Sequence, residues 1–381
     1  MLKSLIILSL ICTMIFGQGI SYRIEAMGKD MAGIISDIET DLLRNPAHIF
    51  DGDFVQLQRS YTTYTTYQFT RTGPIYSGLL VKNPFGVLIE GFAEYSKRQD
   101  APHKYSMISN YFFQSRIMGG LKLSKKPFGL EIGTEIKKVK AASEYAWTNY
   151  IQYNESNDYY ELNRLKLGCI LGTDALHEIM LAGSLIKIKF RDIAEALQRF
   201  ETSDSMNLKF IPRVTYLYSN RLNNKNKYFH LLIDCGQPNT IEEIQFPSNT
   251  FLSEIDNELT GKISVGWEDF LHQKVLIGYG SMYKTDIVLT DSLTTYTHNL
   301  ILPFAVEYKP TNYIFLRAGT SSYLQLKDEY GNIYRNQDFS NGFSYSLGIG
   351  LKFKKFSSDF VIPSSSVLYI NNWKIRVCYE F

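Results

Sequence analysis

The sequence has no apolar run long enough to cross a bilayer as a helix. Its longest such run, Leu5–Phe16, has about a dozen residues, whereas a membrane-spanning helix needs about 20. The run follows Met1–Ser4, which carries one positive charge, and small residues follow at Gly17 and Gly19. These are the three parts of a secretory signal peptide. We expect residues 1–19 to be cleaved and the remainder to be exported through the periplasm; the alternative is a buried N-terminal core strand.

Cysteine is too scarce for a disulfide framework. Only Cys169, Cys235 and Cys378 follow the expected signal peptide, and their odd number and wide spacing match no set of metal ligands. Each lies in a strand-like run, so we interpret all three as wall residues. We expect no metal and no cofactor.

The chain also has no large excess of either positive or negative charge. Lys and Arg total 40 and Asp and Glu total 38, which gives a net charge of +2. A nucleic-acid-binding surface needs a concentrated basic patch. The balance therefore argues against nucleic acid as a partner.

The sequence also lacks a catalytic motif. Its six histidines are scattered, and it has neither an H-E-x-x-H zinc motif nor a G-x-S-x-G nucleophile element. A membrane phospholipase barrel would need a Ser–His pair on adjacent strands, and the sequence identifies no such partner for His230. We expect a protein that is not an enzyme.

Aromatic residues, in contrast, are abundant. The chain has 27 Tyr, 24 Phe and 3 Trp, or 14% of its residues. Membrane barrels concentrate such side chains in girdles at the two bilayer interfaces. Aromatic-rich soluble β-sandwiches also exist, so composition alone does not decide between them.

The main pattern is an alternation of apolar and polar residues along most of the chain. Between Phe343 and Phe353 every odd position is large and apolar, while the even positions are Ser, Gly or Lys. Residues 373–381 repeat this pattern up to Phe381. Successive side chains of a strand point to opposite faces, so each such segment has one apolar and one polar face.

Two further features favour a membrane barrel over a soluble sandwich. Strand-like runs such as Gly342–Lys354 extend beyond about ten residues, whereas soluble strands have about five or six and tilted membrane strands about 9–11. Short and long connections also alternate, as in barrels with short periplasmic turns and long outer loops.

These connections predict an all-β fold, a transmembrane antiparallel up-and-down β-barrel. Residues 85–381 supply 14 strands, and residues 53–82 add a further pair if they form strands, for a total of 16. Short turns are expected at residues 124–127, 172–177, 219–226, 269–271, 309–311 and 355–356. Long outer loops are expected at residues 96–105, 140–159, 191–207, 236–259, 284–297, 321–341 and 363–370, with a helical turn at Ile193–Phe200.

Charged residues fall on the polar face of the alternation. We expect that face to line the lumen, because charge on the lipid face costs about 2–4 kcal/mol at mid-bilayer. Such residues fix a plug or line a solute path, and the sequence does not rank these two roles. The expected lumen-facing residues are Glu307, Arg317, Lys352, Arg376 and Glu380.

Three regions together resemble one family. The first combines Ala26–Gly28, Met31–Gly33 and Arg44–Ala47; the second pairs Val306–Pro310 with Leu316–Gly319; the third runs from Leu347–Gly350 to the terminal Phe381. These patches, about a quarter of the chain, resemble outer-membrane β-barrels of FadL-type hydrophobic-compound transporters and PorV-type proteins. The chain departs from the family's pattern at Lys29, in place of a second Gly, and at His48, also in place of a Gly.

The resemblance implies a plug and an insertion signal. Residues 20–52 would form a plug inside the barrel of residues 53–381, with Gly28, Asn45, Pro46 and Ala47 as its motif residues. The alternative is an ordinary N-terminal helix in the periplasm. Trp373, Tyr379 and Phe381 would form the C-terminal signal that the barrel-insertion machinery reads. The apolar residues of the plug also recur at helix-like spacing up to Pro46: Ile24, Met27, Met31, Ile34, Ile35, Ile38, Leu42 and Leu43.

Two functions follow from the resemblance. The first is passive transport of hydrophobic small molecules through the outer membrane, with outer-membrane lipid and a hydrophobic ligand as partners. The second is a PorV-like binding or scaffold component of a protein secretion system, with a secreted protein as partner. Substrate, cargo and oligomeric state are not contained in the pattern.

Overall fold

The computed structural model describes residues 22–381, except 67–68, 102–103, 148–149, 174, 197–198, 223–225, 238–256, 290–292, 332–334 and 363–373. No helix among the described residues is both long and apolar enough to cross a membrane. The expected signal peptide and Trp373 lie outside the described residues.

The fold is a closed antiparallel barrel in which neighbours in sequence are neighbours in space. β1 closes the barrel by pairing with β16, from Phe54 opposite Glu380 to Ser60 opposite Lys374. The predicted all-β barrel is confirmed, and the total is 16 because residues 53–82 do form a pair of strands, β1 and β2. The strands are β1 (Phe54–Thr66), β2 (Phe69–Lys82), β3 (Phe85–Ala101), β4 (Lys104–Leu123), β5 (Lys126–Trp147), β6 (Tyr150–Leu171), β7 (Ala175–Ala196), β8 (Arg199–Arg221), β9 (Lys227–Gly236), β10 (Asn257–Phe270), β11 (Val275–Leu289), β12 (Leu293–Tyr308), β13 (Ile314–Gly331), β14 (Arg335–Phe353), β15 (Phe356–Ile362) and β16 (Lys374–Glu380).

The two faces of the wall follow the alternation in the sequence. On β14 the odd-numbered residues Leu347, Ile349 and Leu351 are about half exposed, whereas Ser346 is buried on the lumen side. In water such an apolar outer surface would be unfavourable, but in lipid it forms the apolar band of a membrane barrel. This is the architecture of an outer-membrane protein.

Aromatic side chains gather on the outer face near the short turns. Ring contacts link Tyr218 to Phe229, Phe229 to Trp267, and Trp267 to Tyr279, with centroids 6.3, 5.7 and 5.5 Å apart. Such an interfacial row of amphipathic rings marks the level of the lipid headgroups. The abundance of Tyr and Phe in the sequence is explained in part by this row.

The short turns all lie at one end, which is the periplasmic end by the rule of short periplasmic turns. Ser124 and Lys125 both have positive φ, 50° and 67°, the backbone of the tight two-residue hairpin that matches the twist of its strands.

The long outer loops were predicted too long. β7 and β8, for example, pair as far as Ala196 opposite Arg199, so the expected helical turn at Ile193–Phe200 is wrong, and hairpins of the same kind replace most of the expected loops. Beyond the membrane a peptide group still needs a hydrogen-bond partner, and the neighbouring strand supplies it. Both faces then meet water, the alternation disappears, and the sequence resembles a loop. The expected loop at 363–370 lies outside the described residues.

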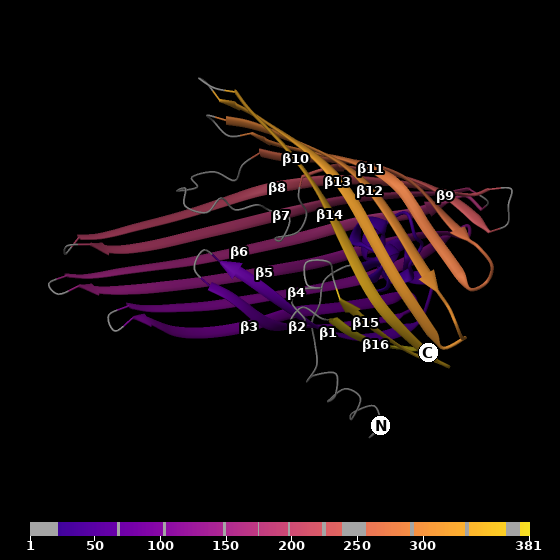
Figure 1. Ribbon diagram of the computed structural model, residues 1–381, viewed down its shortest axis with the longest axis horizontal. Helices are drawn as coiled ribbons and strands as arrows, with labels where there is room; N and C mark the ends of the chain where they lie inside the picture. The colour runs from indigo at the N-terminus through magenta and orange to yellow at the C-terminus, as the bar shows by residue number, and fades with distance from the viewer. Residues whose placement is uncertain are drawn as a thin grey trace.

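Three strands are much shorter than their neighbours. β15 and β16 have 7 residues each and β9 has 10, whereas β8 has 23. Among the described residues, β14 has no ladder partner on its β15 side beyond Leu347, and β8 has none on its β9 side beyond Pro212, whose carbonyl accepts from the Gln237 amide at 3.0 Å. The barrel closes at the periplasmic end and divides outward into two groups of strands, β1–β8 and β10–β14, which diverge in Figure 1.

The segment before β1 folds as four short helical pieces instead of one helix: α2 (Tyr22–Ala26), η1 (Lys29–Met31), α3 (Ile38–Arg44) and η2 (Pro46–Phe50). The helix-like spacing of the apolar residues is therefore distributed over several pieces. Gly28 and Gly33 adopt positive φ of 96° and 86°, a conformation that interrupts a helix. Asp37 then caps α3, its side chain accepting a hydrogen bond from the Thr40 amide at 3.0 Å.

Candidate functional site: the plugged lumen

Residues 22–50 lie inside the barrel, and we call this segment the plug. Its apolar side chains pack against inward-facing wall residues in two clusters. Leu42, Leu43 and Ile49 join Leu79 and Met118 of the wall in one of them. In the other, a set of plug residues meets Leu276 and Ala305: Ile24, Met27, Met31, Ile34 and Ile35. These plug side chains are at most 5% exposed, so the apolar half of the plug pattern serves to fill the lumen.

Glycines of the wall make room for the plug backbone. A side chain at Gly129 would overlap the backbone of Pro46 and Ala47, and one at Gly319 would overlap Met27. At Gly168 it would overlap the side chain of Asn45. Absence of Cβ lets two backbones approach closely, so these inward glycines shape the wall to the plug.

A chain of six alternating charges holds the plug at two points. Arg23 donates to Glu307 at 3.0 Å, and Glu307 also accepts from Arg317 at 2.6 Å. Arg317 and Arg376 both donate to Asp359. The chain, which we call the ionic relay, runs in the order Arg23, Glu307, Arg317, Asp359, Arg376 and Glu39. Its first and last members belong to the plug, and its four central members to β12, β13, β15 and β16.

A second anchor surrounds His48. The imidazole contacts Asp51 at 2.6 Å and Glu178 of β7 at 2.9 Å, and Arg44 donates to the same Glu178 at 3.0 Å. Burial alone would lower the pKa of His48, but the hydrogen bonds to Asp51 and Glu178 and the charges of Glu178 and Asp41 outweigh it and raise the pKa to about 10. His48 is therefore a cation at neutral pH and binds the plug to the wall.

The motif residues of the plug lie between these anchors. Asn45 caps η2 through a hydrogen bond from the Ala47 amide at 3.1 Å and also donates to the Cys169 carbonyl at 3.4 Å. Pro46 and Ala47 are buried. Gly28 lies beside the wall at Gly319 and provides the positive φ that ends the first helical piece.

The five charged residues expected on the lumen side divide into two groups. Glu307, Arg317 and Arg376 belong to the ionic relay, whereas Lys352 pairs with Glu380 at 2.9 Å near the periplasmic mouth, where both are exposed. A cavity of about 670 Å³ opens beneath the plug beside this pair, lined also by Cys378 and Ile38. Of the residues expected to form the insertion signal, Tyr379 and Phe381 are described, and they make edge contact at 5.6 Å between ring centroids.

Higher in the barrel the inner face has a charged side and an apolar side. On β4–β6, Glu131 lies 3.8, 3.4 and 3.6 Å from Arg116, Arg164 and Lys166. On β6–β8 three of the inward residues form an apolar group. Leu162 lies opposite Ile186, and Ser184 lies opposite Ile211, and the three apolar side chains are buried. We call these three residues the lumenal apolar stripe.

His230 has the partners that the sequence did not identify. Ser219 lies 2.9 Å from its Nδ1 and Glu268 lies 3.6 Å from its Nε2. Glu268 also accepts from the plug amide of Ser36 at 3.4 Å. His230 and Glu268 are 4% and 3% exposed, so this group is a packed polar contact between wall and plug.

The sequence alone did not identify several of the residues that hold the plug. Arg23, Glu39, Glu178 and Asp359 are single charges whose partners lie far away in the chain, so no local pattern exposes them. The inward glycines did leave a signal, because Gly348 and Gly350 occupy the polar phase of an alternating strand. Glycine repeated on that face indicates close approach of another backbone.

Comparisons with known proteins identify structures with a similar fold. No protein-family model matches the chain, and no curated protein matches its sequence. A FadL homologue from Pseudomonas aeruginosa has a similar structure, with a TM-score of 0.51 and 10% identity over 97% of this chain and 100% of that one. The ferric yersiniabactin uptake receptor FyuA from Yersinia pestis has a TM-score of 0.50 and 7% identity over 87% of this chain and 68% of its own. The toluene transporter TbuX of Ralstonia pickettii has a TM-score of 0.45 and 11% identity over 95% and 98%. In its fold, the chain is an outer-membrane β-barrel similar to FadL-type hydrophobic-compound channels.

Proposed function

We propose that the protein passively transports hydrophobic small molecules across the outer membrane and releases them sideways through its wall. The division of the wall carries this proposal. Among the described residues, β14 is unpaired on its β15 side from Arg335 to Ser346, and β1 is unpaired on its β16 side from Tyr61 to Thr66. β15 and β16, the two strands that lie between β14 and β1, are short.

The plug makes a sideways route the natural one. Below the division the lumen is filled by tightly packed apolar residues and by the ionic relay, so an axial route requires the plug to move. A molecule that leaves sideways enters lipid, where each Å² of apolar surface removed from water gains about 25 cal/mol. Diffusion down that gradient needs no energy source.

The lumenal apolar stripe fits the same solute class. Leu162, Ile186 and Ile211 place hydrocarbon on the inner face of β6–β8. Hydrocarbon on that face suits an apolar solute better than a sugar or an ion, which would lose water without replacement. No feature of the described residues favours a PorV-like scaffold role, and we do not propose it.

An uptake assay tests the function. Cells that carry the barrel in an otherwise impermeable outer membrane should take up a radiolabelled long-chain fatty acid or monoaromatic faster than vector-only cells, while sugar uptake stays unchanged. Heat-modifiability on a gel confirms folded barrel in both the wild type and the variants below. Equal uptake of the apolar panel by vector-only cells would contradict the proposal.

The route is tested by tethering the plug. The Ser346 hydroxyl donates to the Ala26 carbonyl at 3.1 Å, so positions 26 and 346 adjoin, and the double variant Ala26→Cys with Ser346→Cys is designed to cross-link plug and wall. Oxidation should leave uptake unchanged if solute exits through the wall. Uptake that stops on oxidation and returns on reduction would instead assign the axial route.

A further inference from the structure

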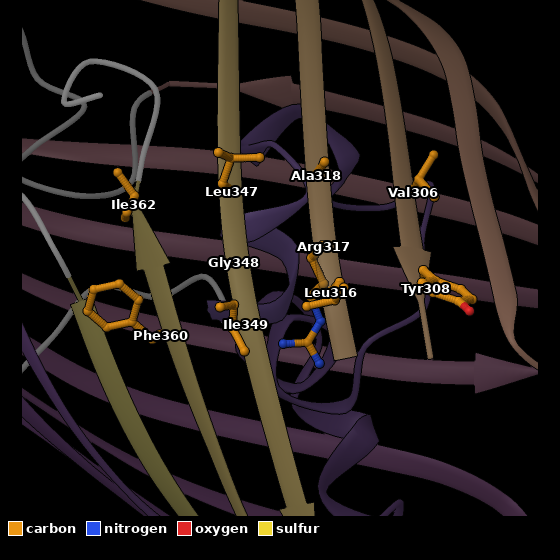
Figure 2. A pocket seen from close by; sticks show the side chains of 10 residues that line it. All are labelled: Val306, Tyr308, Leu316, Arg317, Ala318, Leu347, Gly348, Ile349, Phe360 and Ile362. Atoms are coloured by element: carbon orange, nitrogen blue, oxygen red, sulfur yellow. The ribbon is translucent and has the colours of Figure 1, made fainter. Parts of the chain in front are cut away.

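The outer wall has an apolar groove beside Leu347 and Ile362, the outermost pair of the β14–β15 ladder among the described residues. The groove has a volume of about 480 Å³ and crosses β12–β15. The groove follows two rows of residues that are paired across these strands. Large side chains form its walls, and the small side chain of Ala318 forms its floor. Figure 2 shows Leu316, Ile349 and Phe360 bordering the groove, while Arg317 turns away toward the plug.

A patch of aromatic rings lies next to the groove on its periplasmic side, and two lysines lie over these rings. Phe356 and Tyr379 are in contact, with centroids 4.8 Å apart. Lys354 lies 5.6 Å from the ring centroid of Phe353, and Lys355 lies 5.9 Å from that of Tyr379. A lysine over an interfacial ring holds its ammonium at the headgroup level.

The charge of these two lysines is not balanced locally. Neither takes part in an ion pair between described residues. The nearby acids are occupied: Glu380 pairs with Lys352, and Asp359 faces inward to two arginines of the ionic relay. The outer face of the β14–β15 turn therefore presents two positive charges toward the lipid interface.

The spacing between patch and groove matches a lipid. Phe356 and Phe360 lie on the same face of β15, four residues apart, which is about 13 Å along the strand. A phosphate at the level of the lysines thus places an acyl chain of ordinary length along the groove. The short turns assign this end to the periplasm, so the lipid belongs to the periplasmic leaflet.

We propose that this face of the wall binds one anionic phospholipid of the periplasmic leaflet. Its phosphate lies against Lys354 and Lys355, and one acyl chain lies in the groove over Ala318. The acyl chain covers the ladder at Leu347 and Ile362, the outermost β14–β15 pair that the structure describes. Bound lipid therefore stabilises the wall where the two groups of strands begin to diverge. This effect does not depend on the solute that the barrel carries.

Native mass spectrometry of the full-length barrel in detergent tests the site with phosphatidylglycerol and, for comparison, zwitterionic phosphatidylcholine. The wild type should retain one phosphatidylglycerol and bind phosphatidylcholine at least tenfold more weakly. Lys354→Gln with Lys355→Gln should weaken phosphatidylglycerol binding about tenfold. The matched control, Lys125→Gln with Lys126→Gln, removes two lysines at another periplasmic turn and should change binding less than twofold.

The groove is tested separately. Ala318→Leu fills it and should also weaken binding about tenfold, whereas Ser322→Leu, on the outer face of the same strand but outside the groove, should not. Ala318→Val serves if the leucine variant loses its heat-modifiable band. Equal losses in both lysine pairs would overturn the site in favour of a diffuse basic rim. Equal binding of the two lipids, or full binding by a folded groove-filled variant, would overturn it as well.

Discussion

At the scale of single residues, the fit of plug to wall rests on positions where a side chain is missing. Gly129 is the sharpest case, because any Cβ there would overlap the backbone of Pro46 and Ala47. Backbone cannot rotate aside as a flexible side chain does, so the plug itself must shift.

We expect Gly129→Leu to displace the plug and raise the conductance of the barrel in planar bilayers severalfold over the wild type. Gly119 is the matched control, since it lies on the neighbouring strand and a Cβ there would meet nothing within 4 Å. Gly119→Leu should behave as the wild type. If both variants, folded by heat-modifiability, conduct alike, close backbone packing does not retain the plug.

His48 gives plug retention a pH dependence. Its pKa is about 10 in the docked plug against 6.5 for a free imidazole. Because docking raises the pKa, the contribution is fully present below about 6.5 and is lost as pH rises through about 10. We expect channel openings to become more frequent over that window.

His48→Gln isolates this contribution. The amide keeps a hydrogen-bonding group but carries no charge, so the variant should open more often at neutral pH and change little up to pH 10. Parallel pH profiles of the wild type and the variant would show that another group controls retention.

At the scale of elements, the ionic relay ties four strands to two points of the plug, Arg23 and Glu39. Asp359 is its central acid, only 2% exposed, and it separates Arg317 from Arg376. Breaking a buried ion pair on one side costs about 3–5 kcal/mol, because the remaining charge stays uncompensated. Loss of Asp359 therefore sets two buried arginines against each other.

We expect Asp359→Asn to loosen the plug, which the rate of Cys378 labelling reports. That thiol faces the cavity beneath the plug and is 8% exposed. With Cys169→Ser and Cys235→Ser as background, a membrane-impermeant maleimide should react with it at least severalfold faster. Glu329→Gln is the control, since Glu329 pairs with Lys327 at 2.5 Å far from the plug. Equal labelling rates would remove the relay from plug retention.

The elements also show what the sequence could and could not predict. Strands inside the membrane were predictable, because lipid on one face and plug or water on the other impose alternation, as at Phe343–Phe353. Their continuation beyond the membrane was not, because nothing there distinguishes the two faces. In the plug, Ile24, Met27 and Met31 recur at helix-like spacing and are buried in the structure, but Gly28 and Gly33 interrupt the helical backbone.

The candidate site was predictable only in part. The polar phase of the alternation indicated Arg317 and Arg376 as inward residues, and the structure places both in the ionic relay. Their plug partners Arg23 and Glu39 could not be found, because an ion pair between residues hundreds of positions apart leaves no trace in a single sequence.

At the scale of the whole molecule, wall and plug are held by different interactions. Each wall strand pairs with a neighbour on both sides, and the β1–β16 ladder closes the circle without any plug residue. The plug contributes side-chain contacts, helix caps and the ionic relay, but no strand of the barrel. Closure of the barrel should therefore survive loss of the plug.

We expect deletion of residues 22–50 to leave a barrel that still migrates as a compact band before heating and unfolds at a lower temperature. The charges of the wall that lose their plug partners, such as Glu178, should become hydrated as water fills the lumen. Liposomes containing the deleted protein should leak small polar solutes, whereas those containing the intact protein should not. Protein with the plug tethered through positions 26 and 346 is the sealed control. A deletion that folds and remains sealed would show that wall residues, and not the plug, close the lumen; a deletion that never forms the compact band would show that the plug is needed to build the wall.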